Sequence, residues 1–163
     1  MKKIQVAIIM GSVSDTEVAK KTCRALKDLK ISHEVLVASA HRTPEFLYLK
    51  ISQFERSGVK VYIAIAGMAA HLGGVIASLT VKPVIAVPIG GKMMGLDSML
   101  STVQMPPGVP LAVVAIDGGK NAAILSAQIL AVADKTIAKR LADLRKKDAD
   151  KIQRQNKGLK KLA

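Results

Sequence analysis

The feature that most constrains the fold of this chain is a series of short apolar runs that alternate with segments of helical spacing. Most of these runs are apolar without interruption, which is typical of strands buried on both faces of a parallel sheet. Five runs are expected to be strands: residues 4–10, 34–38, 59–66, 84–88 and 111–116. Because repeated strand–helix units connect by right-handed crossovers, the pattern predicts an α/β fold, a three-layer αβα sandwich with a parallel sheet.

The segments between the runs have apolar side chains at helical spacing. They predict helices over residues 15–29, 44–57, 70–79, 96–103 and 121–133. Ser14 or Asp15 is a suitable cap for the first helix, and Pro44 suits the first position of the second. We therefore expect one α/β domain over residues 1–133, long enough to bury a core.

Residues 134–163 form a basic segment that we expect to be an extended C-terminal helix. They contain 11 of the chain's 25 Lys and Arg residues but only 4 of its 12 Asp and Glu residues. A mostly apolar stripe runs along this helix, interrupted at Asp148, and comprises Ile137, Leu141, Leu144, Ile152, Gln155, Leu159 and Leu162. Such a stripe needs a covering surface, so we expect the helix to pack on the domain or on neighbouring subunits. The lack of interleaved aromatic side chains disfavours nucleic-acid binding.

Several classes of protein are disfavoured by composition. No apolar run approaches the ~20 residues that a membrane helix needs, so no membrane partner is expected. The single cysteine, Cys23, excludes an internal disulfide, and two loop histidines without clustered carboxylates argue against a metal site. The chain has neither a Walker loop nor a Gly-x-Gly-x-x-Gly motif, which disfavours ATP and dinucleotides. We expect a cytoplasmic protein.

Ligands of open α/β sheets bind at the carboxyl ends of the strands, where the first strand-to-helix loop is Gly-Ser-Val-Ser-Asp, residues 11–15. The hydroxyls of Ser12 and Ser14, together with backbone amides, favour an anion. Asp15 can accept hydrogen bonds from a sugar diol. Helix capping by Ser14 and Asp15 explains the same residues equally well.

The second loop, residues 39–44, reads Ser-Ala-His-Arg-Thr-Pro. Since neighbouring parallel strands bring their loops together, Ser39 and Arg42 are expected to complete an anion cradle with the serines of the first loop. His41 then lies beside the anion, and its imidazole can transfer protons near neutral pH. The alternatives are a surface charge for Arg42 and a hydrogen-bonded loop histidine for His41, but the position of His41 favours function.

The third loop, residues 66–74, contains mostly small residues around His71. Small residues let a ligand approach the backbone closely, although helix–sheet packing explains the alanines as well. His71 lies near a helix start and is expected to form hydrogen bonds as a neutral ring. The three loops together predict proton transfer on a small anionic ligand.

These three motifs, with Gly-Leu-Asp-Ser at 95–98 and Gln-Met-Pro at 104–106, resemble the phosphoribosylaminoimidazole carboxylase catalytic subunit family in order and spacing. The bacterial-type members of that family are N5-carboxyaminoimidazole ribonucleotide mutases of purine biosynthesis. The resemblance covers residues 4–133. It implies a flavodoxin-like fold, a homo-octamer whose C-terminal helices reach neighbouring subunits, a nucleotide substrate, and no metal, ATP or organic cofactor.

The resemblance also implies a role for each site residue. His41 and His71 correspond to the active-site histidines, and His41 acts first as acid and then as base while the carboxylate moves from the exocyclic nitrogen to C4. Asp15 holds the ribose hydroxyls. The 5′-phosphate is held by Ser12, Ser14, Ser39 and Arg42, and the remaining implied substrate contacts are Ala40, Gly67, Ala70 and Leu72.

One position departs from the family pattern. Gly73 stands where the family usually has proline, which predicts a more flexible third loop and keeps open a direct carboxylase that uses aminoimidazole ribonucleotide and CO₂. Arg42 and His71 favour the mutase, because the direct carboxylases tend to differ at both places. A nucleic-acid-binding α/β module is a remote alternative.

Overall fold

The computed structural model describes residues 4–91 and 93–159 of the 163-residue chain. Strands and helices alternate as the sequence predicts. In chain order the elements are β1 (Val6–Met10), the short 3-10 helix η1 (Val13–Asp15), α1 (Thr16–Asp28), β2 (His33–Val37), α2 (Pro44–Ser57), β3 (Val61–Ala66), α3 (Leu72–Ser78), β4 (Val84–Pro88), α4 (Leu96–Val103), β5 (Ala112–Val113), α5 (Gly119–Ala131) and α6 (Lys135–Leu159).

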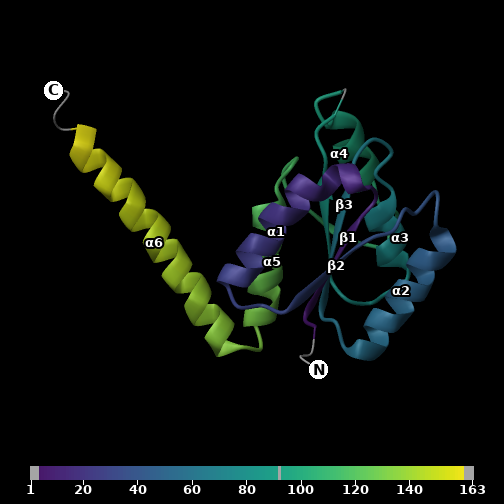
Figure 1. The fold of residues 1–163 in the computed structure, drawn as a ribbon, viewed down its shortest axis with the longest axis horizontal. Coiled ribbons are helices and arrows are strands. Elements are labelled where there is room, and N and C mark those ends of the chain that lie inside the picture. Colours follow the sequence, from purple (N-terminus) through teal and green to yellow (C-terminus); the bar gives the residue numbers. More distant parts are fainter. Residues whose placement is uncertain (1–3, 92, 160–163) are drawn as a thin grey trace.

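The five strands form one sheet, and all neighbouring pairs are parallel, in the order β2-β1-β3-β4-β5. Helices α1 and α5 lie on one side of this sheet, and α2 and α3 lie on the other (Figure 1). The predicted three-layer αβα sandwich is therefore confirmed. In the register of the sheet, Met10 of β1 pairs with Val37 of β2 and with Ile65 of β3, so the carboxyl ends of these three strands are level.

The core consists of two apolar clusters, one on each face of the sheet. Ile8 faces the cluster that includes α1 and α5, whereas its neighbours Ala7 and Ile9 face the cluster that includes α2 and α3. All residues of β1 and β4 are buried, which confirms the interpretation of uninterrupted apolar runs. The edge strand β2 differs, because its Val35 and Val37 are 37% and 38% exposed.

The last strand is shorter than predicted. We expected a strand over residues 111–116, but only Ala112 and Val113 pair with β4. The chain then turns tightly: Gly118 N–H donates to the Ala115 carbonyl at 2.8 Å, and Asp117 has a left-handed backbone with φ 56°. An edge strand has a neighbour on one side only, so apolar sequence alone does not fix its length.

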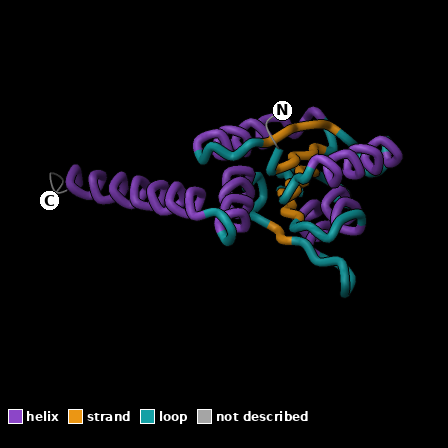
Figure 2. Tube along the Cα trace, turned by 90° about the horizontal axis from the view of Figure 1, so that it is seen from below, coloured by secondary structure: helices purple, strands orange, loops and turns teal. Residues whose placement is uncertain are grey.

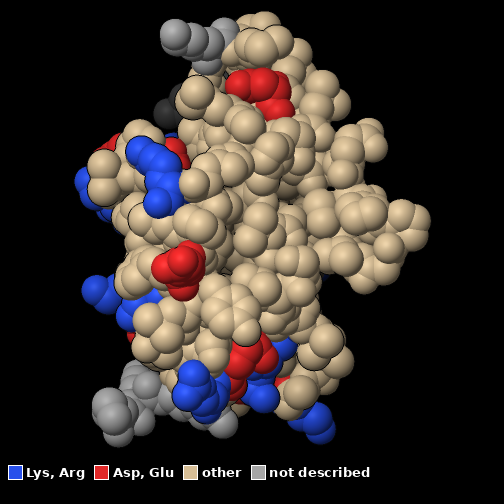
Figure 3. Space-filling view, turned by 90° about the vertical axis from the view of Figure 1, so that its right-hand side faces the viewer, with Lys and Arg blue, Asp and Glu red and all other residues tan. Residues whose placement is uncertain are grey.

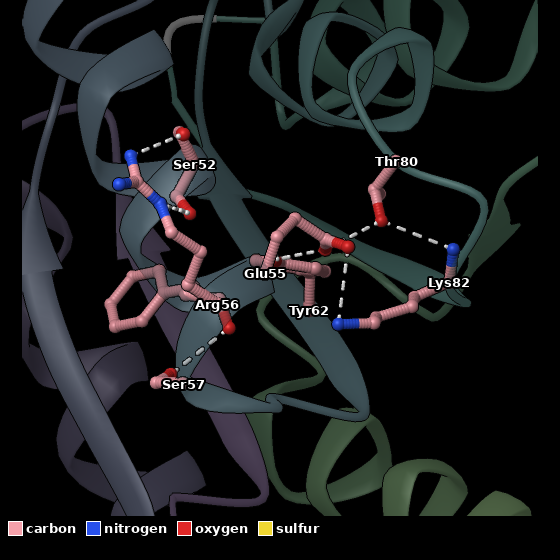
Figure 4. A network of polar contacts seen from close by, with 8 residues as sticks. Ser52, Glu55, Arg56, Ser57, Tyr62, Thr80 and Lys82 are labelled. Carbon is pink, nitrogen blue, oxygen red and sulfur yellow. Dashed lines mark hydrogen bonds and ion pairs between the residues drawn. The ribbon is translucent and has the colours of Figure 1, made fainter.

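A polar network at the amino edge of the sheet joins α2 to β3 and to the turn that precedes β4. Glu55 of α2 accepts hydrogen bonds from the hydroxyls of Tyr62 (2.7 Å) and Thr80 (2.8 Å). Its second oxygen forms an ion pair with Lys82 at 3.1 Å, so all three partners converge on one carboxylate (Figure 4). This network lies at the opposite end of β3 from the loop that carries His71.

Helix α6 packs on the domain along its first half, up to Leu144 and the ion pair of Asp148 with Lys120. Asp134 caps it, since its Oδ1 accepts hydrogen bonds from the N–H groups of Thr136 and Ile137. Ile137 and Leu141 are buried in the cluster that includes α1 and α5.

Farther along, α6 extends away from the sandwich, and Ile152 is 59% exposed (Figures 1 and 2). The extended C-terminal helix is confirmed, whereas Leu162 of the predicted stripe lies outside the described residues. None of the helices in the described ranges has the length and apolar character needed to cross a membrane.

Candidate active site

The three polar loops meet at the carboxyl edge of the sheet. The N–H of Gly11, which follows β1, donates to Ile65 of β3 at 2.9 Å, and the N–H of Ala38, which follows β2, donates to Met10 at 2.9 Å. The loops therefore leave the sheet side by side, as predicted. They bring His41 and Arg42 from the second loop next to Gly11 of the first loop and His71 of the third.

The two histidines form a hydrogen-bonded pair. Nε2 of His41 lies 3.0 Å from Nδ1 of His71, and the rings are nearly perpendicular, with centroids 5.1 Å apart. A hydrogen bond between two ring nitrogens needs one donor and one acceptor, so a single proton lies between them. Both side chains are exposed at the carboxyl edge. The pair can therefore gain or lose a proton where a ligand can reach it.

The side chain of Arg42 ties the first two loops together. Its Nη2 donates to the carbonyl of Gly11 at 3.2 Å, and its backbone N–H donates to Oγ of Ser39 at 3.2 Å. Thr43, which we did not predict as a site residue, holds Ser39 from the other side, because its Oγ1 accepts from the Ser39 N–H at 2.9 Å. These bonds hold the backbone of Arg42 beside Ser39 and its guanidinium beside Gly11 of the first loop.

The first loop is capped differently from our prediction. Ser12 caps the 3-10 helix η1 that precedes α1, because its Oγ accepts a hydrogen bond from the Ser14 N–H at 3.3 Å. Asp15 occupies the N-cap position of α1 but forms no side-chain capping bond. The capping explanation therefore does not account for Asp15.

Asp15 is instead a buried carboxylate, with 6% of its surface exposed. It accepts a hydrogen bond from the Ser14 hydroxyl at 3.0 Å. Burial raises the pKa of Asp15, and the hydrogen bonds from Ser14 and from the Ser12 backbone oppose this effect only in part. No ion pair with Asp15 is found among the described residues. A carboxylate of this kind has free acceptor capacity for a hydroxyl-rich ligand.

The third loop turns sharply before α3. Met68 has a left-handed backbone with φ 56°, and its side chain is exposed. Ala70 and Leu72 are each 2% exposed, so their side chains belong to the core and do not face a ligand. Gly67 approaches Ile89 so closely that a Cβ at this position would lie 3.3 Å from the Ile89 Cβ. Ala40 of the second loop is half-buried against the cluster that includes α2.

Gly73 lies inside α3 rather than in the third loop, and the expected flexibility of the loop stays a prediction. It is the second residue of α3 and is buried. A Cβ at Gly73 would lie 3.1 Å from Cβ of Ala86 and 3.3 Å from Cδ2 of Leu111. The absence of a side chain here serves close packing of α3 on β4.

Two further residues contact the third loop from α4 and were not predicted. Ser101 Oγ accepts a hydrogen bond from the Ala70 N–H at 3.0 Å, and Thr102 Oγ1 donates to the Ala70 carbonyl, 3.1 Å away. The only sequence signal for them is a pair of adjacent hydroxyl residues in a short helix. Their partner lies more than 30 positions earlier in the chain, beyond the reach of local patterns.

Comparison with known proteins gives consistent matches over nearly the whole chain. The family model described as AIR carboxylase matches residues 5–151. An N5-carboxyaminoimidazole ribonucleotide mutase of Methanocaldococcus jannaschii is 52% identical over 157 residues, covering 96% of this chain and 98% of that protein. The protein of the same name from Bacillus subtilis is 48% identical over 143 residues, covering 86% and 88%.

Solved structures agree with these sequence matches. The crystal structure of Treponema denticola PurE superposes with a TM-score of 0.89 at 32% identity and covers 96% of this chain and 98% of that one. A variant of Treponema denticola PurE2 gives a TM-score of 0.91 at 31% identity, with coverage of 97% and 99%. The similarity therefore includes the sandwich, the three loops and α6.

Proposed function

The chain belongs to the AIR carboxylase family, and from this premise we propose that it is an isomerase of purine biosynthesis, converting N5-carboxyaminoimidazole ribonucleotide into 4-carboxyaminoimidazole ribonucleotide. The observation that carries the proposal is the His41–His71 pair, joined at 3.0 Å beside the Arg42 side chain. The relatives that are 48–52% identical bear the name of this mutase. The predicted cytoplasmic location stays a prediction.

The nucleotide binds through its phosphate and its ribose. Arg42 supplies the positive charge, because a guanidinium matches the geometry of phosphate oxygens. The hydroxyls that share the phosphate with it are those of Ser12, Ser14 and Ser39. Asp15, buried next to Ser14, accepts hydrogen bonds from the ribose hydroxyls. This arrangement directs the base toward the histidine pair.

The first chemical step is a protonation. Protonated His41 gives its proton to the exocyclic nitrogen while the bond from that nitrogen to the carboxylate carbon breaks. The bonding electrons stay on nitrogen, so the products are aminoimidazole ribonucleotide, CO₂ and neutral His41. His71, at 3.0 Å from His41, holds the imidazole in place during this change of protonation state.

The second step reverses the direction of proton transfer. Carbon C4 of the aminoimidazole attacks CO₂, forming the new carbon–carbon bond and leaving C4 with both a hydrogen and a carboxylate. Neutral His41 removes that proton, which restores the aromatic ring and the protonated histidine. One imidazole serves as acid and then as base, and a group that titrates near neutral pH is suited to both roles.

Between these steps CO₂ has to remain in the site. The third loop offers a small-residue backbone around Gly67, next to the buried Ala70 and Leu72. Small residues let this backbone lie close to the substrate, and exclusion of water from the closed site limits the escape of a small apolar molecule. Because Gly73 is packed inside α3 rather than in this loop, it does not favour the direct carboxylase over the mutase.

We extend the proposal to assembly as a homo-octamer. The face that carries α2, α3 and α4 is largely uncharged (Figure 3). Exposed large apolar side chains on α2 and α4 are Phe46, Tyr48, Leu49, Leu96, Leu100 and Val103. Apolar surface of this extent is typical of contact between protein chains. The distal part of α6, where residues 151–156 are exposed, supplies a second contact.

The test is an ultraviolet assay that follows formation of the 4-carboxy product from two starting points. We expect efficient turnover of N5-carboxyaminoimidazole ribonucleotide, and slow turnover of aminoimidazole ribonucleotide with bicarbonate. When unlabelled carbamate substrate reacts in ¹³C-bicarbonate, the product should remain largely unlabelled, because the CO₂ is retained. Efficient turnover only with aminoimidazole ribonucleotide and bicarbonate would overturn the mutase assignment.

A further inference from the structure

Helix α4 reaches across to the third loop and binds both sides of one residue in it. The Ala70 N–H donates to Ser101 Oγ at 3.0 Å, and the Ala70 carbonyl accepts from Thr102 Oγ1, which lies 3.1 Å away. Two consecutive residues of α4 therefore hold the donor and the acceptor of Ala70. The next residue in the chain is His71.

The hydroxyl protons of Ser101 and Thr102 can form further hydrogen bonds to backbone carbonyls. Ser101 has one proton to donate, and both Met68 O (3.3 Å) and Ser98 O (3.2 Å) lie within reach. The proton of Thr102 is likewise shared between Ala70 O and Ser98 O (2.7 Å). The loop is thus tied to the backbone of α4 through two hydroxyls, and Thr102 is 3% exposed. Hydrogen bonds shielded from water in this way hold geometry more firmly than exposed ones.

The loop needs such support because its backbone is unfavourable without it. Met68 adopts φ 56°, a left-handed region that is unfavourable for a non-glycine residue. It persists only where the surroundings fix it. His71 follows this turn as the N-cap residue of α3 and contacts His41 through Nδ1. Movement of the turn would therefore change the distance between the two rings.

The helix that supplies this support is anchored independently of Ser101 and Thr102. The single proton of Ser98 Oγ lies within reach of the carbonyls of Ile89 (2.8 Å) and Gly95 (2.9 Å), which ties the start of α4 to the residue after β4. Removal of the two later hydroxyls thus leaves α4 in place and releases only the loop.

We propose that Ser101 and Thr102 are positioning residues, which hold His71 at hydrogen-bonding distance from His41 by fixing the backbone of Ala70. This role rests on the proposed mutase function for its catalytic consequence, but the geometric effect does not depend on it. Neither hydroxyl touches the substrate. Each acts through the peptide groups that precede His71.

The test compares Ser101→Ala, Thr102→Val and the double variant with matched controls. Thr22→Val and Ser126→Ala remove buried hydroxyls in α1 and α5, which donate to the carbonyls of Val18 and Ala122 in the same helix. We expect kcat of the double variant to fall about 10- to 100-fold, with KM changed less than about 3-fold, because a misplaced catalytic group costs up to about 100-fold. The controls should keep wild-type kcat, and Thr102→Ser should retain activity.

A second measurement, NMR of the histidine rings, does not depend on enzyme activity. The chain has three histidines, so NMR at fixed pH should resolve the ring signals of His33, His41 and His71. The double variant should shift the signals of His41 and His71 and leave His33, which bonds to Ile31 at 2.9 Å on β2, unchanged. Ring signals equal to those of the controls would overturn the positioning role, whatever the rates. Shifted signals in an enzyme that fails to turn over the carbamate would support the positioning role while contradicting the proposed function.

Discussion

At the scale of single residues, proton transfer depends on His41 and on the bond that orients it. Replacement His41→Asn keeps a polar side chain of similar reach but removes the group that gains and loses a proton near neutral pH. We expect kcat to fall by about 10²- to 10⁴-fold, the usual contribution of a general acid–base group. The affinity for aminoimidazole ribonucleotide, measured by calorimetry, should change little because Arg42 and the serines remain.

The control for this experiment is His33→Asn, since His33 lies at the opposite end of β2 from His41. It should retain full activity. A His41→Asn enzyme with near-normal kcat would remove His41 from the mechanism.

The Asp15 carboxylate is expected to strengthen nucleotide binding but to lower the stability of the fold at neutral pH. It is buried, and its burial raises the pKa of its carboxyl above the ordinary 3.8. The folded state therefore binds the proton more tightly than the unfolded state, and stability falls as pH rises through the ordinary range of the group. At neutral pH, Asp15→Asn should raise the free energy of unfolding by on the order of 1 kcal/mol and weaken nucleotide binding.

Urea unfolding at several pH values measures this effect. The gain from Asp15→Asn should be greatest near pH 7 and should shrink toward pH 3, where the carboxyl is protonated in both states. The exposed Asp28→Asn serves as control and should change stability by less than about 0.5 kcal/mol. A variant that is less stable than the wild type at pH 7 would mean that the Asp15 carboxylate stabilises the fold.

At the scale of elements, some boundaries follow directly from local chemistry. Helix α2 has the predicted bounds, because Pro44 suits its first turn and Gly58 ends it with a left-handed backbone at φ 81°. The start of α3 was predicted two residues too early, since the left-handed Met68 and the turn after it precede the helix. No pattern of apolar residues reveals such a turn.

The candidate site, like the helix boundaries, has features that the sequence predicts and features that it does not. The gathering of the three loops follows from strand order, and the positions of His41, Arg42 and His71 could be predicted from it. The bonds from α4 to Ala70 could not, because they join residues about 30 positions apart through side chains that look ordinary in sequence.

The network around Glu55 should contribute to stability without affecting catalysis. Burial alone would raise the pKa of Glu55, but the hydrogen bonds from Tyr62, Thr80 and Lys82 together outweigh it, and the pKa lies below the ordinary 4.5. We expect Glu55→Gln to lower the free energy of unfolding at pH 7 by about 1–2 kcal/mol, since a hydrogen-bonded charge is lost from a partly exposed site. Because the network lies at the amino edge, kcat should stay unchanged.

The stabilising contribution of the Glu55 carboxylate should depend on pH. A carboxyl whose pKa is lowered by folding stabilises the protein above pH 4.5, and the contribution disappears as the pH falls below that value. The stability difference between wild type and Glu55→Gln, from thermal unfolding, should therefore vanish in acid. The exposed Glu34→Gln is the control. Equal stability of Glu55→Gln and Glu34→Gln at pH 7 would contradict a stabilising role of the network.

At the scale of the whole molecule, α6 combines two different functions along its length. Its first part belongs to the core, because Ile137 and Leu141 are buried and Arg140 donates to the carbonyl of Leu29 at 3.1 Å. Its distal part leaves the sandwich with Ile152 exposed. Stability of the single chain and assembly of several chains should therefore depend on different parts of one helix.

Removal of residues 149–163 tests this separation. The shortened chain keeps Ile137, Leu141 and Leu144, so its circular dichroism and its thermal unfolding should change little when both chains are compared as single subunits. Its mass in solution, from light scattering after gel filtration, should fall below that of the full chain, because subunit contacts made by the distal helix are lost. The full-length variant Lys151→Gln/Arg154→Gln keeps the helix and its apolar side chains while it lowers the charge. It should assemble normally, and a shortened chain that still assembles to the full mass would show that the uncharged face over α2, α3 and α4 is sufficient for assembly.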